Sequence, residues 1–199
     1  MLAKRIFDFV CALLGLLVLS PLLLLIMLLI KLDSPGPVFF CQLRVGQFER
    51  HFLIYKFRTM IVAAESKGLK LTVGCDPRIT RLGRVLRLSK LDELPQLLNV
   101  LIGQMSLVGP RPEVLEYVKH YPLTVRGIVF RVKPGITDWA SIKMIDENKL
   151  LAQAKNPEQL YLEQLVPLKL AYAVKYVKTR TFGGDILLIL LTLAKIFTR

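Results

Sequence analysis

A run of apolar residues near the N-terminus constrains this chain more than any other feature. Residues 10–30 are 21 consecutive positions occupied almost entirely by Leu, Ile, Val, Ala and Met. A straight helix of that length covers about 31 Å, roughly the hydrocarbon thickness of a bilayer. A cleaved signal peptide fits less well, because no small-x-small cleavage site precedes Lys31. The run therefore predicts a helix inserted in a membrane.

Ser20 and Pro21 interrupt this run at its middle. Proline removes one backbone donor and crowds the preceding turn, and a serine hydroxyl can satisfy the freed backbone groups, so the pair predicts a bend at membrane depth. Both ends are basic, with Lys4 and Arg5 before the run and Lys31 after it. Positive charge is retained on the cytoplasmic side, which suits a re-entrant helix with both ends there. A kinked helix that spans the bilayer is equally open on these grounds.

The chain as a whole is strongly basic. Lys and Arg number 28 against 15 Asp and Glu, a formal charge of +13, although 53% of the residues are hydrophobic. This hydrophobicity excludes a disordered chain, and three cysteines are too few, and odd in number, for a disulfide-stapled module. The charge predicts anionic partners: phosphorylated small molecules, an anionic membrane or nucleic acid. Nucleic acid is disfavoured because no recognisable binding motif is present.

Breaker residues at 32–37 end the apolar run, so we expect a membrane helix over 1–31 and a second domain over 32–199. β-branched and aromatic residues at 38–45 and 52–57 predict a β-hairpin. Helical patterns occupy much of the remainder: 59–67, 78–87, 95–102, 113–120 and 158–178. The predicted fold class is α/β, mostly helical with a small sheet.

A second apolar stretch, 186–194, is too short to cross a bilayer. It follows Gly183, Gly184 and Asp185, which predict a break and a helix N-cap. Two arrangements fit this stretch: an amphipathic helix lying on the membrane surface, or a terminal helix packed on the core.

Arginines suited to phosphate occur in two places. Arg78, Arg81, Arg84 and Arg87 recur at every third position, and Arg111 stands between two prolines in a rigid turn. Guanidinium groups bind phosphate oxygens in bidentate fashion, so these arginines could form a phosphate-binding wall. A solvated helix face and an ordinary loop explain the same two patterns.

Asp92 and Glu93 are neighbouring acids just ahead of Pro95, in what we expect to be the first turn of a helix. A carboxylate there stays ionised beside arginines, and an ionised aspartate can attack phosphorus. A structural role also fits, because Ser89 and Asp92 have the spacing of a capping box.

The cysteines and histidines show no spacing typical of metal ligands: Cys11, Cys41, Cys75, His51 and His120. We expect structural roles for all five, with neither a zinc site nor a cysteine–histidine nucleophile. The residues by themselves thus indicate a basic domain, attached to a membrane, that handles phosphate.

Five short motifs occur in a characteristic order. They are Lys-Phe-Arg-Thr-Met at 56–60, Asp-Pro-Arg-Ile-Thr at 76–80, Leu-Asp-Glu-Leu-Pro-Gln-Leu at 91–97, Ser-Leu-Val-Gly-Pro-Arg-Pro-Glu at 106–113 and Pro-Gly-Ile-Thr at 134–137. Each motif alone is weak, whereas five in this order are highly specific. Together they resemble the bacterial sugar transferases of the monotopic phosphoglycosyl transferase superfamily, in its small form, and the likeness covers residues 20–185.

The resemblance implies transfer of a sugar 1-phosphate from a UDP-sugar to undecaprenyl phosphate, with release of UMP and with Mg²⁺ as cofactor. This would be the first membrane step of glycoconjugate or exopolysaccharide synthesis. The resemblance also implies a place on the cytoplasmic face of the bacterial inner membrane, in contact with membrane lipid and either alone or as a homodimer. The expected architecture is a re-entrant helix broken at Ser20 and Pro21, followed by a catalytic domain that ends in a membrane-surface helix.

Roles are carried over residue by residue. Asp92 matches the nucleophile that takes the phosphosugar covalently in a ping-pong reaction, and we expect it to contact Mg²⁺ as well. Glu93 matches its neighbour in the catalytic dyad. The cations of the motifs are expected to bind substrate phosphate or nucleotide: Lys56, Arg58, Arg78, Arg87 and Arg111.

Two positions depart from the family's pattern. Gln104 stands where many relatives carry Asp, and Asp138 stands where many carry Gly, which bears on the sugar pocket. Neither departure removes the Asp92–Glu93 dyad. The hypothesis of a different class is a non-catalytic basic module, anchored in the membrane, that binds anionic lipid or a partner protein, with Asp92 as a helix cap.

Overall fold

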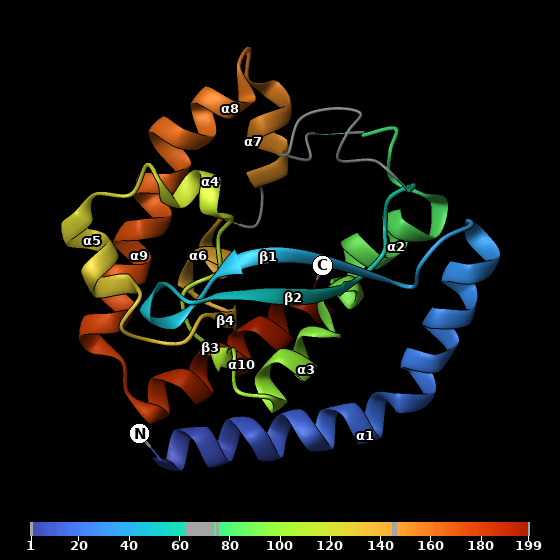
Figure 1. The fold of residues 1–199 in the computed structure, drawn as a ribbon, viewed down its shortest axis with the longest axis horizontal. Coiled ribbons are helices and arrows are strands. Elements are labelled where there is room, and N and C mark those ends of the chain that lie inside the picture. The colour runs from blue at the N-terminus through green and yellow to red at the C-terminus, as the bar shows by residue number, and fades with distance from the viewer. Residues whose placement is uncertain (1, 63–73, 75, 145–146, 199) are drawn as a thin grey trace.

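The computed structural model describes residues 2–62, 74, 76–144 and 147–198, and Figure 1 shows their arrangement. A long helix, α1, runs along the outside of a body in which helices surround two small sheets. Among the described residues, α1 is the one helix long and apolar enough to cross a membrane. The expected fold class, mostly helical with a small sheet, is confirmed.

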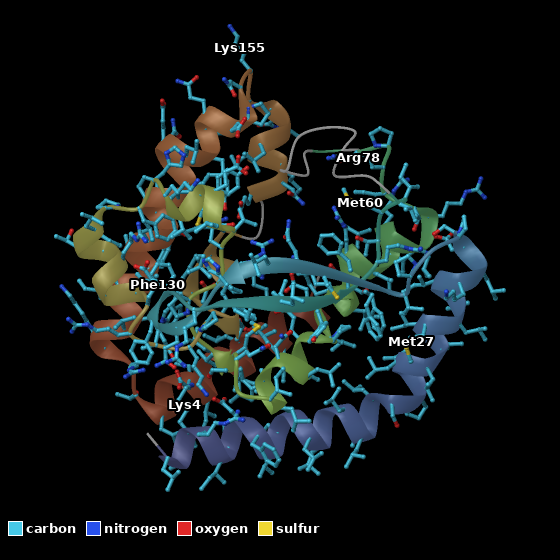
Figure 2. The ribbon with its side chains drawn as sticks, viewed as in Figure 1. Lys4, Met27, Met60, Arg78, Phe130 and Lys155 are labelled. Carbon is cyan, nitrogen blue, oxygen red and sulfur yellow. The ribbon has the colours of Figure 1, made fainter. Side chains whose placement is uncertain are left out.

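Helix α1 (Leu2–Asp33) contains Pro21 and continues through it. The Ser20 hydroxyl donates, at 2.7 Å, to the carbonyl oxygen three positions earlier, next to the break that Pro21 makes in the backbone bonding. Figure 1 shows α1 as two arms that meet at a bend, and Figure 2 places Lys4 on the first arm and Met27 on the second. The expected interruption of a straight helix is confirmed.

Polar side chains fix the first arm of α1 to the body. Arg5 donates at 2.6 and 2.8 Å to the last two carbonyl oxygens of α3 (Gln96–Leu101), where a cation is favourable at a helix C-terminus. The buried Asp8 accepts from the Ser106 hydroxyl at 2.8 Å. A charged group buried in this way needs its partner, so the first arm is held in one position.

Apolar packing and one arginine fix the second arm. Ile26 and Ile30 are buried in a cluster with Phe57 and Leu86. Arg58 donates to the Ile30 carbonyl oxygen at 3.3 Å. Both arms of α1 therefore contact the same body, while the opposite side of the helix exposes its leucines.

The expected hairpin is present as β1 (Phe39–Val45) and β2 (His51–Phe57), which pair antiparallel. Asn99 of α3 is fully buried and joins the helix to this hairpin. Its amide group donates to the Leu53 carbonyl oxygen at 2.7 Å, and its carbonyl oxygen accepts from the Tyr55 backbone amide at 3.0 Å. The side chain thus supplies the hairpin with both a donor and an acceptor.

The segment after β2 differs from its prediction. Residues 59–62 form no helix, and Met60 makes an isolated bridge with Ile79 instead, so the helix expected to begin at residue 59 is wrong there. Positions 63–67 of that prediction lie outside the described residues. The next helix is α2 (Arg81–Ser89).

A 3-10 turn, η3 (Leu91–Glu93), separates α2 from α3. Ser89 ends α2, and its hydroxyl donates to the carbonyl oxygens of Val85 and Leu86 at 2.8 and 3.2 Å. The alternative interpretation, a capping box formed by Ser89 and Asp92, is therefore wrong, because the Ser89 hydroxyl is used inside its own helix.

The remaining elements form the other side of the body. β3 and β4 pair in parallel, and the helix expected over 158–178 is divided into α8, a π-helical turn η4 and α9. The helix expected over 113–120 is reduced to α4. In chain order the elements are β3 (Ser106–Val108), α4 (Leu115–Val118), α5 (Leu123–Val129), β4 (Gly135–Thr137), α6 (Trp139–Lys143), α7 (Glu147–Gln153), α8 (Pro157–Leu160), η4 (Tyr161–Leu165) and α9 (Val166–Thr179).

The last helix, α10 (Phe182–Phe197), begins earlier than predicted. Thr181 is the N-cap, and its hydroxyl accepts a backbone amide at 3.0 Å. Asp185, the expected cap, is instead buried and pairs with Lys4 of α1. Leu188 is buried in the core, so one face of α10 packs on the body, and the outward face exposes Leu187, Leu190 and Leu193.

We expect Asn99→Ala to lower the free energy of unfolding by about 2 kcal/mol, because buried backbone groups of Leu53 and Tyr55 lose their side-chain partner. Denaturant titration of the detergent-solubilised protein measures this change. Gln159→Ala, which removes an exposed amide, is the matched control and should change stability little. Equal effects of the two variants would contradict the role assigned to Asn99.

Candidate active site

A cavity of about 1300 Å³ lies between the hairpin, the α2–α3 junction and helices α6, α7 and α9. Its lining residues come from segments far apart in the sequence, so the fold alone brings them together. Every residue predicted as catalytic or substrate-binding is among them: Lys56, Arg58, Arg78, Arg87, Asp92, Glu93 and Arg111.

Glu93 is buried between two cations. Lys56 Nζ donates to Glu93 Oε1 at 2.8 Å, and Arg111 donates to both carboxylate oxygens, with 3.1 Å between Nη1 and Oε2. Burial alone raises the pKa of Glu93, but Arg111 and Lys56 outweigh it and hold the pKa well below its usual range. Glu93 is therefore ionised and committed to its two partners.

The two cations respond differently to this contact. Burial lowers the pKa of Lys56, which Glu93 only partly offsets, whereas Glu93 raises the pKa of Arg111. The three side chains carry two positive charges and one negative charge. The cluster thus places a net positive charge at the cavity wall, and both cations are first of all partners of Glu93.

Asp92 lies beside this cluster in different surroundings. It is only 8% exposed, and Oδ1 has no hydrogen-bond partner among the described residues. Burial, and then the charge of Glu93, raise the pKa of Asp92, while Lys56, Lys90 and Arg87 act in the opposite direction. The unpartnered oxygen is a carboxylate oxygen that a substrate or a metal ion could use.

Arginines of the predicted stripe are divided between the cavity and solvent. Arg87 Nε donates to Thr59 Oγ1 at 2.8 Å. This bond does not use the two terminal nitrogens of the guanidinium group. Arg78 pairs with Asp76 at 2.6 Å and lies on the segment that leads into α2 (Figure 2). Both line the cavity, whereas the other two members of the stripe are exposed: Arg81 and Arg84.

Arg58 also lines the cavity, but its guanidinium is bonded to the chain that follows α1. It donates to the Pro35 carbonyl oxygen at 2.8 Å, and to the Ser34 carbonyl and hydroxyl oxygens at 2.6 and 2.9 Å. These bonds show that Arg58 fixes the exit of α1.

The loop that carries Arg111 is held by residues that the sequence did not single out. Arg44 of β1 donates to the Pro112 carbonyl oxygen at 3.2 Å and to Glu113 Oε1 at 3.1 Å. Glu113 closes the fourth motif, which is a signal that could have identified it. Arg44 occupies an ordinary strand position, and nothing in the sequence marks it.

The two departures from the family's pattern have different surroundings. Asp138 accepts from the Arg111 backbone amide at 3.2 Å and from the Ser141 amide at 2.7 Å, which caps α6. Gln104 accepts from the Asn99 side chain at 2.8 Å and is not part of the cavity lining. Asp138 thus supports the Arg111 loop, and Gln104 supports the hairpin contact.

Asp92 is the residue best placed to hold a divalent ion. Within the ranges that the structure describes, no group of three or more Asp, Glu, His or Cys residues could hold a metal. Mg²⁺ commonly takes one or two carboxylates and completes its coordination with substrate phosphates and water. The free Oδ1 of Asp92 fits this mode, whereas both oxygens of Glu93 are taken by cations.

The family model for bacterial sugar transferases matches residues 1–199, the whole of the sequence. The chain belongs to the bacterial sugar transferase family. The order of the five motifs, and the cavity that they line, agree with this membership.

Three curated relatives match nearly all of this chain. An Aeromonas hydrophila UDP-N-acetylgalactosamine-undecaprenyl-phosphate N-acetylgalactosaminephosphotransferase is 38% identical over 98% of the chain. Two UDP-glucose:undecaprenyl-phosphate glucose-1-phosphate transferases are 40% identical over 92% of it, from Escherichia coli (strain K12), and 38% identical over 98%, from Xanthomonas campestris pv. campestris. The chain spans 44%, 40% and 38% of the lengths of these three relatives.

We expect Glu93→Gln to lower the free energy of unfolding at pH 7 by on the order of 3 kcal/mol, because Lys56 and Arg111 would lose the carboxylate between them. Since the pKa of Glu93 is depressed in the fold, its contribution is present above the ordinary carboxyl pKa and is lost as pH falls through the depressed one. Thermal melts of the protein at several pH values test both statements. Glu163→Gln, at an exposed position, is the control.

Proposed function

We propose that this chain transfers a sugar 1-phosphate from a UDP-sugar to undecaprenyl phosphate and releases UMP, as a priming step of glycoconjugate or exopolysaccharide synthesis. The observation that carries this proposal is the Asp92 carboxylate, buried at the wall of a cationic cavity with one oxygen unpartnered. The names of the relatives support undecaprenyl phosphate and a UDP-sugar as the two substrates.

The reaction we propose has two half-reactions at one phosphorus atom. A carboxylate oxygen of Asp92 attacks the phosphorus that carries the sugar, the new Asp92–phosphorus bond forms, and UMP leaves with the bridging oxygen and its electron pair. A phosphate oxygen of undecaprenyl phosphate then attacks the same phosphorus, and Asp92 departs as a carboxylate. A covalent intermediate lets one site serve a soluble donor and a lipid acceptor in turn.

The other site residues have supporting roles in this proposal. Glu93 is a positioning residue, because its carboxylate is held by Lys56 and Arg111. The terminal nitrogens of Arg87 bind phosphate oxygens next to Asp92. Mg²⁺, held by Asp92 and the substrate phosphates, would offset the repulsion between the carboxylate and the pyrophosphate.

The arrangement of α1 supports a re-entrant helix on the cytoplasmic face of the inner membrane. Arg5 and Asp8 hold the first arm to the body, and Arg58 holds the end of the second. A helix that crossed the bilayer would carry its two ends to opposite sides, away from a shared body. We assign residues 1–31 to this membrane helix and 32–199 to the catalytic domain, with the exposed leucines of α10 on the membrane surface.

Asp92→Asn separates catalysis from a structural role. We expect UMP release from a UDP-sugar with undecaprenyl phosphate and Mg²⁺ to fall by on the order of 10³-fold or more, because the nucleophile is lost. The raised pKa of Asp92 means that its ionised form is less favourable in the folded state than in the unfolded state. At pH 7 the neutral asparagine should therefore keep or raise the melting temperature. This gain should vanish at acid pH, where the Asp92 carboxyl is itself neutral.

The measurement pairs UMP release with thermal melts, and mass spectrometry of the protein after incubation with UDP-sugar alone should detect a phosphosugar adduct in the wild type only. A helix cap would instead cost about 0.5–2 kcal/mol of stability on removal, with turnover retained. That outcome would favour a non-catalytic basic module that binds anionic lipid or a partner protein.

A second prediction concerns the membrane helix. In a chain with Cys11, Cys41 and Cys75 changed to Ser, we expect Leu2→Cys and Asp33→Cys each to resist a membrane-impermeant maleimide in intact cells and to react in inverted vesicles. Both positions are exposed in the structure, so protection would come from the membrane. Labelling of Leu2→Cys in intact cells would show that α1 spans the bilayer.

A further inference from the structure

One wall of the cavity carries a connected set of polar side chains, of which only Arg44 and Glu113 have been given a role, as supports of the Arg111 loop. Tyr161 donates to Glu113 Oε2 at 2.5 Å, and Lys169 Nζ donates to Glu147 Oε1 at 2.7 Å and to the Tyr161 hydroxyl at 3.3 Å. Arg44 pairs with Glu113 at 3.1 Å from the other side. These five residues, which we term the polar wall, all line the cavity.

The polar wall differs in charge from the side of the cavity near Asp92. Its two cations, Arg44 and Lys169, are matched by Glu113 and Glu147, so its formal charge is zero. On the α2 side, neither Arg87 nor Lys90 forms an ion pair within the described residues. The positive charge of each acts to lower the pKa of Asp92. The α2 side of the cavity therefore presents cations without a carboxylate partner in an ion pair in the described part of the chain, whereas the cations of the polar wall are each matched by a carboxylate.

This difference distinguishes the two halves of a UDP-sugar. The departing half, UMP, is anionic and is favoured near uncompensated cations. The hexose is neutral and rich in hydroxyl groups, which need donors and acceptors in equal supply. The ammonium of Lys169, the phenol of Tyr161 and the carboxylates of Glu113 and Glu147 provide both donors and acceptors on one wall. A site built from hydrogen bonds discriminates strongly between sugars with different hydroxyl patterns.

The local backbone also marks this wall. Tyr161 begins the π-helical turn η4, where an α-helix would have continued from α8 into α9. Such turns disturb the regular hydrogen bonding and are frequent at functional sites. Lys169 Nζ lies 4.6 Å from the centre of the Tyr161 ring, so the turn holds the phenol against the ammonium.

We propose that the polar wall is the subsite that recognises the hexose of the donor, with Glu147, Lys169 and Tyr161 setting which sugar is accepted. The proposal rests on the transferase activity proposed above. The relatives named for N-acetylgalactosamine and for glucose align over 98% and 92% of this chain. Sugar choice in such proteins can therefore reside within the length that this chain shares with them.

The test compares Glu147→Gln, Lys169→Met and Tyr161→Phe with the wild type on UDP-glucose, UDP-galactose, UDP-N-acetylglucosamine and UDP-N-acetylgalactosamine. UMP release gives kcat/KM for each donor, and added UMP gives the inhibition constant of the nucleotide. We expect the ratio of kcat/KM between the preferred donor and the next to change at least tenfold, with the UMP inhibition constant unchanged. Tyr161→Phe removes one hydroxyl and keeps the ring, so it retains the packing.

Controls with the same chemical change lie outside the cavity. Glu163→Gln and Lys175→Met alter exposed positions on the same helical run and should leave the donor ratios unchanged. An equal loss for all four donors, or a changed UMP inhibition constant, would overturn the assignment, because the wall would then serve structure or the nucleotide. A wild type that releases UMP from none of the four donors would instead contradict the proposed transfer from these UDP-sugars, on which the assignment rests.

Discussion

Glu93, buried between Lys56 and Arg111, holds together the three segments that form the site. The lysine comes from β2, the carboxylate from the η3 turn, and the arginine from the loop that follows β3. A buried carboxylate without these cations would be protonated, and the cations without it would repel each other. Their mutual neutralisation therefore fixes the cavity wall next to Asp92 and leaves one net positive charge there.

Asp92 and Glu93 are adjacent in sequence, yet their environments shift their pKa values in opposite directions. The 3-10 turn directs successive side chains about 120° apart, so one carboxylate meets the cations and the other faces the cavity. Pairs of acids separated in this way are a recurring means of assigning different roles to the same chemical group. Here the result is one carboxylate held by two cations and one with an oxygen that has no partner among the described residues.

Helix α1 is attached to the same framework. Asp8 of the first arm bonds to Ser106 in β3, the strand that leads into the Arg111 loop. Arg58, which holds the end of the second arm, is followed in the chain by Thr59, and the Thr59 hydroxyl accepts from Arg87. The contacts that hold α1 to the body therefore involve the same segments that position two cations of the site, Arg111 and Arg87. In the re-entrant arrangement proposed above, the exposed leucines of α1 and α10 would face lipid.

The sequence by itself determined the elements that local pattern controls: the apolar helix bent at Pro21, the hairpin, and the motif that carries Asp92 and Glu93. Pattern failed in two ways. Ser89 matches a capping box, but a competing local bond within α2 uses its hydroxyl. The polar wall joins Arg44 to Tyr161 through Glu113, across more than half of the chain, and no local pattern marks such long-range contacts. Charge pairing inside a cavity depends on which segments meet there, so only the tertiary structure decided which carboxylate is neutralised and which is left free.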